Sequence, residues 1–454
     1  MKNGFFLIFL EKPQSVSNFV APFNEKYKMS NYMEKGMIIK GIVLSLVFPF
    51  VFGACKSEPD YDNAWSREID NVIYKFDGEN VTADLENSAE EIRIVPYVVL
   101  KGEERPVTRI ADYAFYYRNI QRLYLPSTLK EIGESAFENA DIKELYLENI
   151  EPWCEINLAL NSSDLSLVWP AIYNASTSAN PIGAGTRVYV NGSPLGDLDI
   201  PGNIKKINDF VFMNLHCGKI NIAEGVEKIG AYAFANTVTD EINLPSSIKE
   251  IDPEAFSMCK GGDVLNIPEN LVKVGGGAFP PTISKFYVSS LGKWLEIYYD
   301  CSYTHNGNIE LIYPFQIPYD LIINGSPAED VTIPSDVNKI NQLAFLYSNI
   351  KSLNCEEGLK TIDSQALINC KELESVYLPS TIEEVSCNFQ GCDNLKKIEI
   401  RSKIPPMVNT FVFANYLHID TNVASNCTLY VPQESVEMYR NDEWWGYIKN
   451  IVGI

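Results

Sequence analysis

Histidine, the side chain that most often carries acid–base catalysis near neutral pH, occurs only three times in the 454-residue sequence. His216, His305 and His418 lie outside any His-Glu-x-x-His pattern and outside any known nucleophile motif. The sequence has no Gly-x-Gly-x-x-Gly or phosphate-binding loop. Acidic residues are abundant enough for a glycosidase pair, but no two of them stand out. We therefore expect a protein that is not an enzyme and uses no cofactor or metal.

One cysteine lies in a sequence context that predicts its chemistry. Lys35 and Lys40 precede an apolar run at 41–52, which is too short for a spanning helix and is typical of a secretory signal. A glycine–alanine pair then directly precedes Cys55, and this resembles a bacterial lipobox. The resemblance implies cleavage before Cys55 and lipidation of its thiol. The alternative is a plain signal or membrane anchor with an incidental cysteine.

The segments around Cys55 extend this prediction. Residues 1–54 form the signal region, and residues 1–32 within it are interpreted as an over-extended start, because later methionines lie closer to the signal than Met1 does. Residues 55–67 form a lipidated, acidic tether. In some anaerobic Gram-negative bacteria such acidic residues accompany export to the cell surface. We expect an outer-membrane protein that is held only by its lipid and faces outward.

A repeat of fixed period dominates the rest of the chain. Leu123–Phe137 reads Leu-Tyr-Leu-Pro-Ser-Thr-Leu-Lys-Glu-Ile-Gly-Glu-Ser-Ala-Phe, and Ile242–Phe256 is a close copy. The landmark apolar residue recurs in steps of 22 to 24 within each of three blocks, which is typical of a solenoid. The landmark positions are Phe115, Phe137, Phe212, Phe234, Phe256, Phe279, Phe345, Leu367, Phe389 and Phe413.

The repeat predicts how each coil folds. Leu-x-Leu alternates with period two, so both leucines face inward and x faces outward, and the proline that follows ends the strand. Ile-x-x-Ile then returns the chain across the coil, and Ala-Phe fills the interior from the far side. One unit cannot bury its apolar groups alone, so the units must stack. The expected fold is a β-rich repeat solenoid with a parallel concave sheet and short turns or 3-10 segments on the convex side.

The outward x residues form a column along the predicted sheet, with neighbours about 4.8 Å apart. We call it the outer column. Its tyrosine and asparagine residues would suit contact with a protein or a neutral glycan. The alternative is that these residue types only make a stable sheet. The predicted ligand-binding residues are Tyr124, Tyr146, Asn221, Asn243, Asn266, Tyr287, Asn354, Tyr377, Glu399 and Tyr430, and Asp199 and Thr332 complete the column.

The remaining boundaries follow from the repeat. Residues 68–106 are predicted to be an N-terminal β cap, residues 107–432 the solenoid, and residues 433–454 a C-terminal cap. Insertions at 148–203 and 289–336 carry matching Asn-Gly-Ser-Pro sequences 133 residues apart, so we expect a duplicated block with a hairpin in each copy. Trp444 and Trp445 are interpreted as part of the C-terminal cap, with a sugar-binding pair as the alternative.

Composition narrows the function further. The chain has 37 basic and 59 acidic side chains, which argues against nucleic acid as a partner. Cys259, Cys370 and Cys392 each lie three residues after a landmark residue, so we expect them to be small buried hydrophobes. Nine cysteines besides Cys55 give an odd number without a Cys-x-x-Cys pair, which supports neither a disulfide framework nor a zinc site.

The Leu-x-Leu-Pro, Ile-Gly or Ile-Asp, and Ala-Phe elements resemble the BspA-like, treponemal-type leucine-rich repeat family over about residues 107–432. The resemblance implies a secreted or surface protein that adheres to host proteins or other cells. It does not identify a ligand, because a fold does not determine function.

Three functions remain open. The first is a lipoprotein whose concave face binds a protein partner or host matrix component. The second is a carbohydrate-binding lipoprotein for glycan capture, and the third is a structural envelope protein. In each case the membrane contact is the lipid anchor alone.

Overall fold

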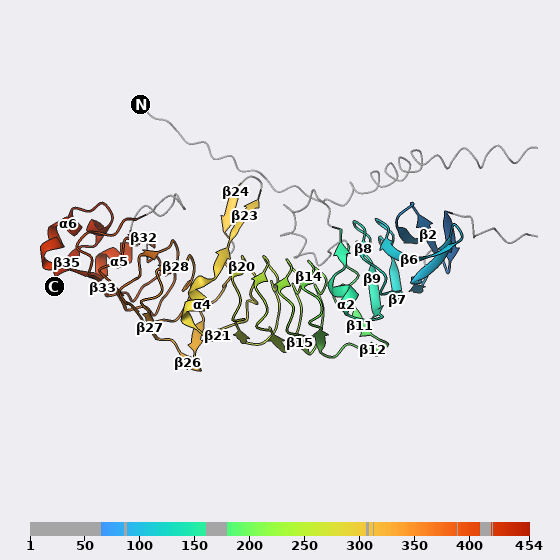
Figure 1. The fold of residues 1–454 in the computed structure, drawn as a ribbon, viewed down its shortest axis with the longest axis horizontal. Helices are drawn as coiled ribbons and strands as arrows, with labels where there is room; N and C mark the ends of the chain where they lie inside the picture. Colours follow the sequence, from blue (N-terminus) through green and yellow to red (C-terminus); the bar gives the residue numbers. More distant parts are fainter. Residues whose placement is uncertain are drawn as a thin grey trace, which may run out of the picture. The chain divides into compact units, whose positions relative to one another are not determined.

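Parallel strands that pair in register from coil to coil build the fold (Figure 1). The computed structural model describes residues 65–85, 89–159, 179–305, 308–311, 313–387, 389–408, 419 and 421–454. These residues form a parallel-strand solenoid of about 15 turns. The predicted fold class is therefore confirmed. Cys55 and the whole signal region lie outside the described residues.

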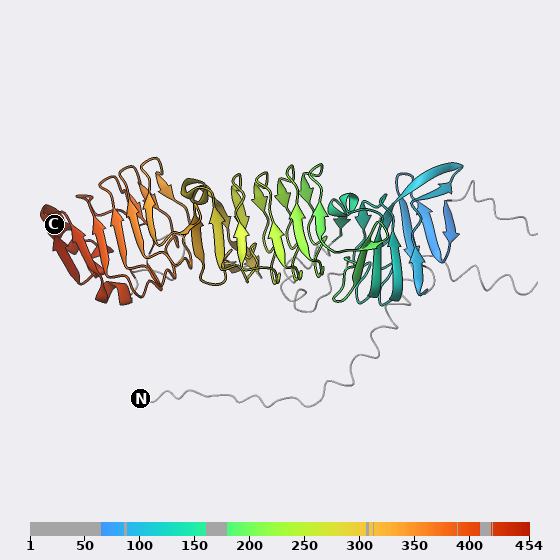
Figure 2. The same ribbon diagram turned by 90° about the horizontal axis from the view of Figure 1, so that it is seen from below.

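The first row of strands contains the Leu-x-Leu segments, which lie side by side in Figure 2. Apolar and outward residues alternate along these strands, as in β7 and β9, so one face is buried; β25, with two adjacent buried residues, is an exception. The row has four sheets. They contain β4 (Glu91–Arg93), β7 (Asn119–Leu125), β9 (Asp141–Leu147) and β11 (Arg187–Val190); then β13 (Leu198–Ile200), β15 (Lys219–Ile222) and β17 (Glu241–Asn243); then β19 (Val264–Asn266), β21 (Lys285–Val288) and β25 (Asp320–Ile323); then β27 (Asp330–Ile333), β29 (Ser352–Cys355), β31 (Ser375–Leu378), β33 (Lys397–Ile400), β34 (Thr428–Val431) and β35 (Asn450–Gly453).

A second row of short strands comes from the Ile-x-x-Ile part of the repeat. Each strand has an outward residue followed by a buried one, which is Ile, Val or Leu, as in Glu250 and Ile251, except in β22, where it is Tyr299. The strands also pair in parallel between coils. They are β8 (Glu131–Ile132), β10 (Asn157–Leu158), β14 (Lys206–Ile207), β16 (Lys228–Ile229), β18 (Glu250–Ile251), β20 (Lys273–Gly275), β22 (Tyr298–Asp300), β28 (Lys339–Ile340), β30 (Thr361–Ile362) and β32 (Glu384–Val385).

The Ala-Phe part of each coil is a turn rather than a 3-10 helix. In seven of the described coils its backbone has two residues with positive φ four positions apart, such as Tyr232 and Asn236, which flank the buried Phe234. The N–H of Phe234 donates to the carbonyl of Ala255 on the next coil at 2.8 Å. Inside, Phe234 stacks on Phe256 with ring centroids 5.0 Å apart. Every landmark residue that the structure describes is buried, as the repeat predicts.

The N-terminal strands and the C-terminal helices flank the coils. Near the N-terminus, the first three strands pair antiparallel in chain order, and the third of them also pairs in parallel with β6. The strands are β1 (Ser66–Ile69), β2 (Val72–Phe76), β3 (Val81–Leu85), β5 (Tyr97–Leu100) and β6 (Glu103–Ile110). The C-terminal elements are α5 (Thr421–Asn426), α6 (Val436–Arg440) and the 3-10 helices η2 (Gln433–Ser435) and η3 (Trp445–Tyr447).

The two insertions contribute strands to both rows. In the first, α2 (Glu151–Cys154) leads to β10 and later to β11 and β12 (Ser193–Pro194). In the second, α4 (Leu291–Glu296) leads to β22, the β23–β24 hairpin (Ser302–His305, Asn308–Leu311), β25 and β26 (Ser326–Pro327). The expected hairpins at both Asn-Gly turns are confirmed by the antiparallel pairs β11–β12 and β25–β26.

Buried tryptophans show that the two insertions are equivalent. The indole Nε1 of Trp153 donates to the carbonyl of Val211, and that of Trp294 donates to the carbonyl of Ala344, each at 2.8 Å. Val211 and Ala344 both directly precede a landmark phenylalanine. The duplication inferred from the sequence therefore extends to the packing of these residues.

Candidate functional site

The outer column has its densest aromatic stretch on β4, β7, β9 and β11. Parallel pairing puts Arg93 beside Tyr124, Tyr124 beside Tyr146, and Tyr146 beside Tyr189. All four side chains point away from the core because they alternate with buried leucine, isoleucine and valine residues.

Tyr124, Tyr146 and Tyr189 form a stack that we call the tyrosine ladder. The ring centroids of Tyr124 and Tyr146 lie 4.3 Å apart, and those of Tyr146 and Tyr189 lie 4.5 Å apart, with nearly parallel planes. The guanidinium carbon of Arg93 lies 3.7 Å from the Tyr124 ring centroid. The ring faces are thus largely covered by one another, and the ladder offers its ring edges to solvent.

A row of alternating charge runs beside the tyrosine ladder, two residues earlier on each strand. Arg122 pairs with Glu91 and Arg187 with Glu144, each at 2.6 Å. The Tyr146 hydroxyl also donates to Glu144 at 2.9 Å. This hydrogen bond to a carboxylate raises the pKa of Tyr146 to about 12, because ionisation would place a phenolate beside a negative charge.

The middle of the outer column is made of amides that bond to one another. Asn221 donates to Asp199 and Asn243 donates to Asn221, each at 2.9 Å. Beside them, Lys219 pairs with Glu241 at 2.6 Å. The predicted binding residues Asn221 and Asn243 therefore use much of their hydrogen-bonding capacity within the sheet, which matches the alternative that they stabilise the fold.

The column is interrupted in its third sheet. Asn266 lies beside the exposed Tyr287, and the next residue in register is Ile322. Ile322 is buried, so no polar side chain continues the column on β25. Asn266 and Tyr287 are therefore separated from the binding residues predicted further along.

The last sheet of the row returns to a mixed aromatic and charged column. Register aligns Thr332, Asn354, Tyr377, Glu399 and Tyr430. The Lys397 ammonium contacts Glu399 at 3.1 Å and lies 4.7 Å from the Tyr377 centroid and 5.0 Å from that of Tyr430. These tyrosines contact a lysine of the same chain, whereas the tyrosine ladder is stacked on itself.

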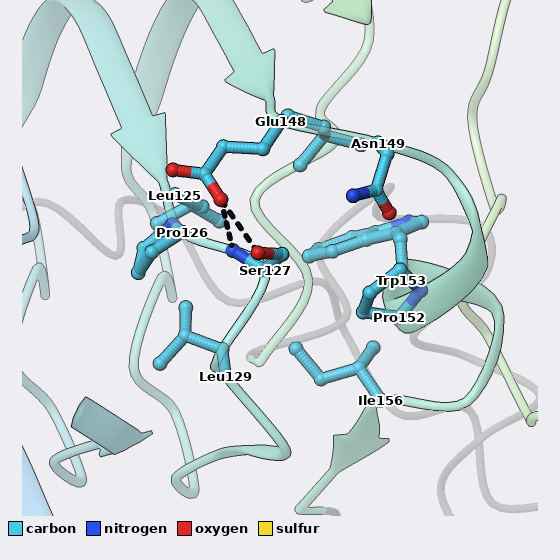
Figure 3. Close-up of a pocket in the computed structure, with 10 residues that line it drawn as sticks. Leu125, Pro126, Ser127, Leu129, Glu148, Asn149, Pro152, Trp153 and Ile156 are labelled. Carbon is cyan, nitrogen blue, oxygen red and sulfur yellow. Dashed lines mark hydrogen bonds between the residues drawn. The ribbon is translucent and has the colours of Figure 1, made fainter. Parts of the chain in front are cut away.

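A shallow pocket lies where β7 and β9 end (Figure 3). The Trp153 indole points from α2 toward Ser127, and the wall is apolar except at Ser127, Glu148 and Asn149. Glu148 accepts hydrogen bonds from the Ser127 N–H at 2.9 Å and from the Ser127 hydroxyl at 2.6 Å. The lining residues are Leu125, Pro126, Ser127, Leu129, Leu147, Glu148, Asn149, Pro152, Trp153 and Ile156.

The serine–glutamate pair in this pocket is a structural feature of the repeat. Ser380 bonds to Glu357 in the same way, through both its N–H and its hydroxyl. Ser246 also donates its N–H to Glu224 of a neighbouring coil. A contact that recurs between coils ties the turns together, so the pair at Ser127 gives no reason to infer a nucleophile.

The remaining histidine and cysteine residues give no sign of a reactive site in the described part of the chain, although Cys370, Cys387 and Cys392 lie close together in the core. His216 is exposed and forms an isolated parallel β-bridge with Val238, the side chain of His305 is not described, and His418 lies outside the described residues. All nine cysteines in the described part are free thiols, and Cys259, Cys370 and Cys392 are buried as predicted. Among the described residues, no group of three or more His, Cys, Asp and Glu side chains could hold a metal ion.

Trp444 and Trp445 do not form an exposed platform. Both are buried, and the Nε1 of Trp445 donates to the carbonyl of Pro406 at 3.1 Å. Their surface is used in packing, which leaves no free ring face for a sugar.

Sequence reasoning missed two members of the aromatic stretch. The predicted outer column includes neither Tyr189, which lies within the predicted insertion at 148–203, nor Arg93, which lies within the predicted N-terminal cap at 68–106. The sequence did contain a signal for Tyr189, since Val188-Tyr189-Val190 alternates and leads into an Asn-Gly turn.

The stacked coils and their repeat define a leucine-rich repeat solenoid. A family model described as "BspA type Leucine rich repeat region" matches six copies over residues 103–156, 185–304 and 318–434. This is more than half of the chain, and the protein therefore belongs to the BspA-type leucine-rich repeat family. A search of curated proteins finds no match.

Several solved structures resemble this chain at low sequence identity. A leucine-rich cell surface protein from Faecalibacterium prausnitzii is 16% identical, covers 86% of this chain and 94% of its own, and has a TM-score of 0.43. A leucine-rich repeat protein from Bacteroides ovatus is 18% identical, with coverages of 85% and 78% and a TM-score of 0.40. The pneumococcal vaccine antigen PcpA is 16% identical, with coverages of 86% and 99% and a TM-score of 0.37.

Proposed function

We propose that this protein is a non-catalytic surface lipoprotein that binds a protein partner, such as a host matrix component, through its outer column. The observation that carries the proposal is the tyrosine ladder with its flanking arginines. The side chains of Arg93, Arg122 and Arg187 are 57%, 46% and 68% exposed beside the ladder. Tyrosine and arginine are enriched in the residues that dominate protein–protein binding energy.

The geometry of the ladder favours a protein over a glycan. A sugar ring stacks on an open aromatic face, whereas the faces in the tyrosine ladder lie against each other at 4.3 and 4.5 Å. Hydroxyl edges beside alternating charges suit the mixed polar groups of a protein surface. Membership of the BspA-type family, and the resemblance to a solved structure described as a leucine-rich cell surface protein, are consistent with this role but do not name the partner.

A binding screen tests the proposal. The purified protein is presented to an array of extracellular matrix proteins and to a glycan array, and then compared with a Tyr124→Ser, Tyr146→Ser, Tyr189→Ser triple variant. We expect a protein ligand whose affinity falls at least tenfold in the triple variant. The matched control is Tyr298→Ser, which removes an exposed tyrosine from the second row of strands. Glycan hits alone, or a ligand that the triple variant binds normally, would contradict the proposal.

The lipid anchor at Cys55 and the outward orientation belong to the same proposal. In the part of the chain that the structure describes, no helix is long and apolar enough to cross a membrane. Cys55→Ser is expected to release the protein from the membrane fraction. Protease treatment of intact cells should release peptides from residues 107–432 if the protein faces outward, and full protection would mean that its partner lies in the periplasm.

A further inference from the structure

Three exposed tyrosines cluster on the turn between β6 and β7. Tyr113, Tyr116 and Tyr117 have 52%, 42% and 64% of their surface exposed. Tyr113 and Tyr116 meet edge to face with centroids 5.9 Å apart, and Tyr116 and Tyr117 do so at 4.5 Å. Unlike the parallel rings of the tyrosine ladder, these perpendicular rings leave aromatic surface open to solvent. We call this group the tyrosine cluster.

Two carboxylates of the next coil border the tyrosine cluster. The Tyr113 hydroxyl donates to Glu134 at 3.3 Å. Glu138 lies near enough to Tyr116 for its charge to add to the effect of burial in raising the pKa of that phenol. Neither glutamate pairs with a described basic residue, whereas the nearby Asp112 is neutralised by Arg109. Even with Arg118 next in the chain, the carboxylates leave a negative surface beside the rings.

The backbone conformation at Tyr117 belongs to the repeat. Tyr117 has a φ of 55°, in the left-handed region. The equivalent position is asparagine in four other coils, at Asn139, Asn214, Asn236 and Asn369, and it is Met258 and Tyr347 in two more. The turn therefore accepts several residue types here, and Tyr117 is the most exposed of the three tyrosines in the cluster.

Aromatic faces next to unpaired carboxylates are the two components that attract an organic cation. A guanidinium can lie flat on a ring while its N–H groups bond to carboxylates. We propose that the tyrosine cluster, with Glu134 and Glu138, is a docking site for an arginine side chain of a protein partner. This site shares no residue with the outer column, so either can be correct without the other.

Short peptides with one cation test the proposal on the purified protein. The probes are acetyl-Gly-Arg-Gly-amide, its lysine analogue and its glutamine analogue, and the measurement is saturation transfer from the protein to each peptide by NMR. We expect transfer to the arginine methylenes and none to the glutamine peptide. Equal signals for arginine and glutamine would overturn the role of charge, and equal signals for arginine and lysine would overturn the assignment to a guanidinium.

Two double variants locate the binding. Tyr116→Ser with Tyr117→Asn removes the rings and installs the residue that other coils use at this backbone position, so the fold should be kept. Glu134→Gln with Glu138→Gln removes the charges. Each is expected to reduce the arginine signal at least threefold, while Tyr298→Ser leaves it unchanged. An arginine signal that survives both double variants would place the binding elsewhere and overturn the proposal.

Discussion

The inner phenylalanine stack and the outer tyrosine ladder have nearly the same geometry in different surroundings. Inside, Phe234 and Phe256 stack at 5.0 Å and are fully buried. Outside, Tyr124 and Tyr146 stack at 4.3 Å and are half-buried. In both places, parallel register brings equivalent residues of successive coils face to face.

This comparison teaches that stacking by itself does not mark a functional residue. A solenoid aligns any side chain that recurs with the repeat, whether it is phenylalanine, tyrosine or asparagine. The two stacks differ in their exposure to solvent and in the side chains that surround them. The inner stack is surrounded by aliphatic side chains, and the tyrosine ladder is surrounded by Arg122, Arg187 and Glu144.

The largest expected effect is on the inner stack. Phe256→Ala removes a fully buried ring between Phe234 and the next coil and should lower the free energy of unfolding by roughly 3–5 kcal/mol. The matched substitution in the tyrosine ladder, Tyr124→Ala, should lower the free energy of unfolding by only about 1–2 kcal/mol, because it removes stacking contacts but exposes little of the core. Urea unfolding, followed by circular dichroism and by tryptophan fluorescence, measures both.

Coupling in a solenoid acts mainly between neighbouring coils, so unfolding need not be two-state. The unfolding curves from circular dichroism and from tryptophan fluorescence must therefore coincide before a single free energy of unfolding is derived from them. A loss below about 1 kcal/mol for Phe256→Ala would contradict the contrast between the two stacks.

The duplicated tryptophans provide a smaller effect within the core. Trp153→Phe removes the hydrogen bond to the carbonyl of Val211 and should cost roughly 1–3 kcal/mol, because a buried carbonyl loses its partner. Trp294→Phe should cost less, since the carbonyl of Ala344 also accepts the Tyr319 hydroxyl at 3.5 Å. Thermal unfolding of both variants ranks their losses of stability. A larger loss for Trp294→Phe than for Trp153→Phe would show that the Tyr319 hydroxyl does not compensate for the missing indole.

The repeat period was enough to predict the coils and the buried landmarks, because a stacked unit must bury the same positions each time. It did not predict that the insertions add strands to both rows. Their spacing departs from the repeat, and the pairing of β11 with β9 depends on how the intervening chain folds back. The second row was anticipated only as a return segment, since two-residue strands such as β18 leave almost no periodic signal.

The candidate site was only partly predictable for the same reason. Tyr124 and Tyr146 follow the period, whereas Tyr189 lies outside it and joins them only through strand pairing. Asn221 and Asn243 were selected by position, but their bonds to each other appear only once the coils are stacked. The tyrosine cluster lies in a turn, where left-handed backbone geometry rather than periodicity decides which side chains meet.

Glu254 is an acidic residue whose side chain is buried. Its side chain is 1% exposed, neither of its carboxylate oxygens has a described hydrogen-bond partner, and burial raises its pKa. The folded state therefore holds a proton that the unfolded chain releases at lower pH, so stability falls as the pH rises from the unfolded pKa through the folded pKa. Glu254→Gln should be more stable than the parent at neutral pH, with the difference shrinking toward acidic pH.

Glu250, four residues earlier, is the control with the opposite sign. Its bond to Lys228 at 2.9 Å lowers the pKa of the Glu250 carboxyl, so the stability it contributes is present above the unfolded pKa and is lost as the pH falls through the folded pKa. Glu250→Gln should be less stable than the parent at neutral pH. Thermal unfolding from pH 3 to pH 8 separates the two cases, and parallel curves for both variants would rule out a buried, unpaired carboxylate at Glu254.

The smallest expected effect is a shift in the pKa of Tyr146 in the tyrosine ladder, not a change in stability. Tyr146 should ionise at a pKa of about 12, above the ordinary value of 10.0, because its hydroxyl donates to Glu144. Tyrosinate absorbance of the parent minus that of Tyr146→Phe isolates this group, and circular dichroism checks that the fold persists at each pH. Glu144→Gln should lower the pKa toward the ordinary value. A parent pKa near 10.0 would mean that Glu144 does not hold the hydroxyl, so the ladder would offer a partner one more free donor than the structure shows.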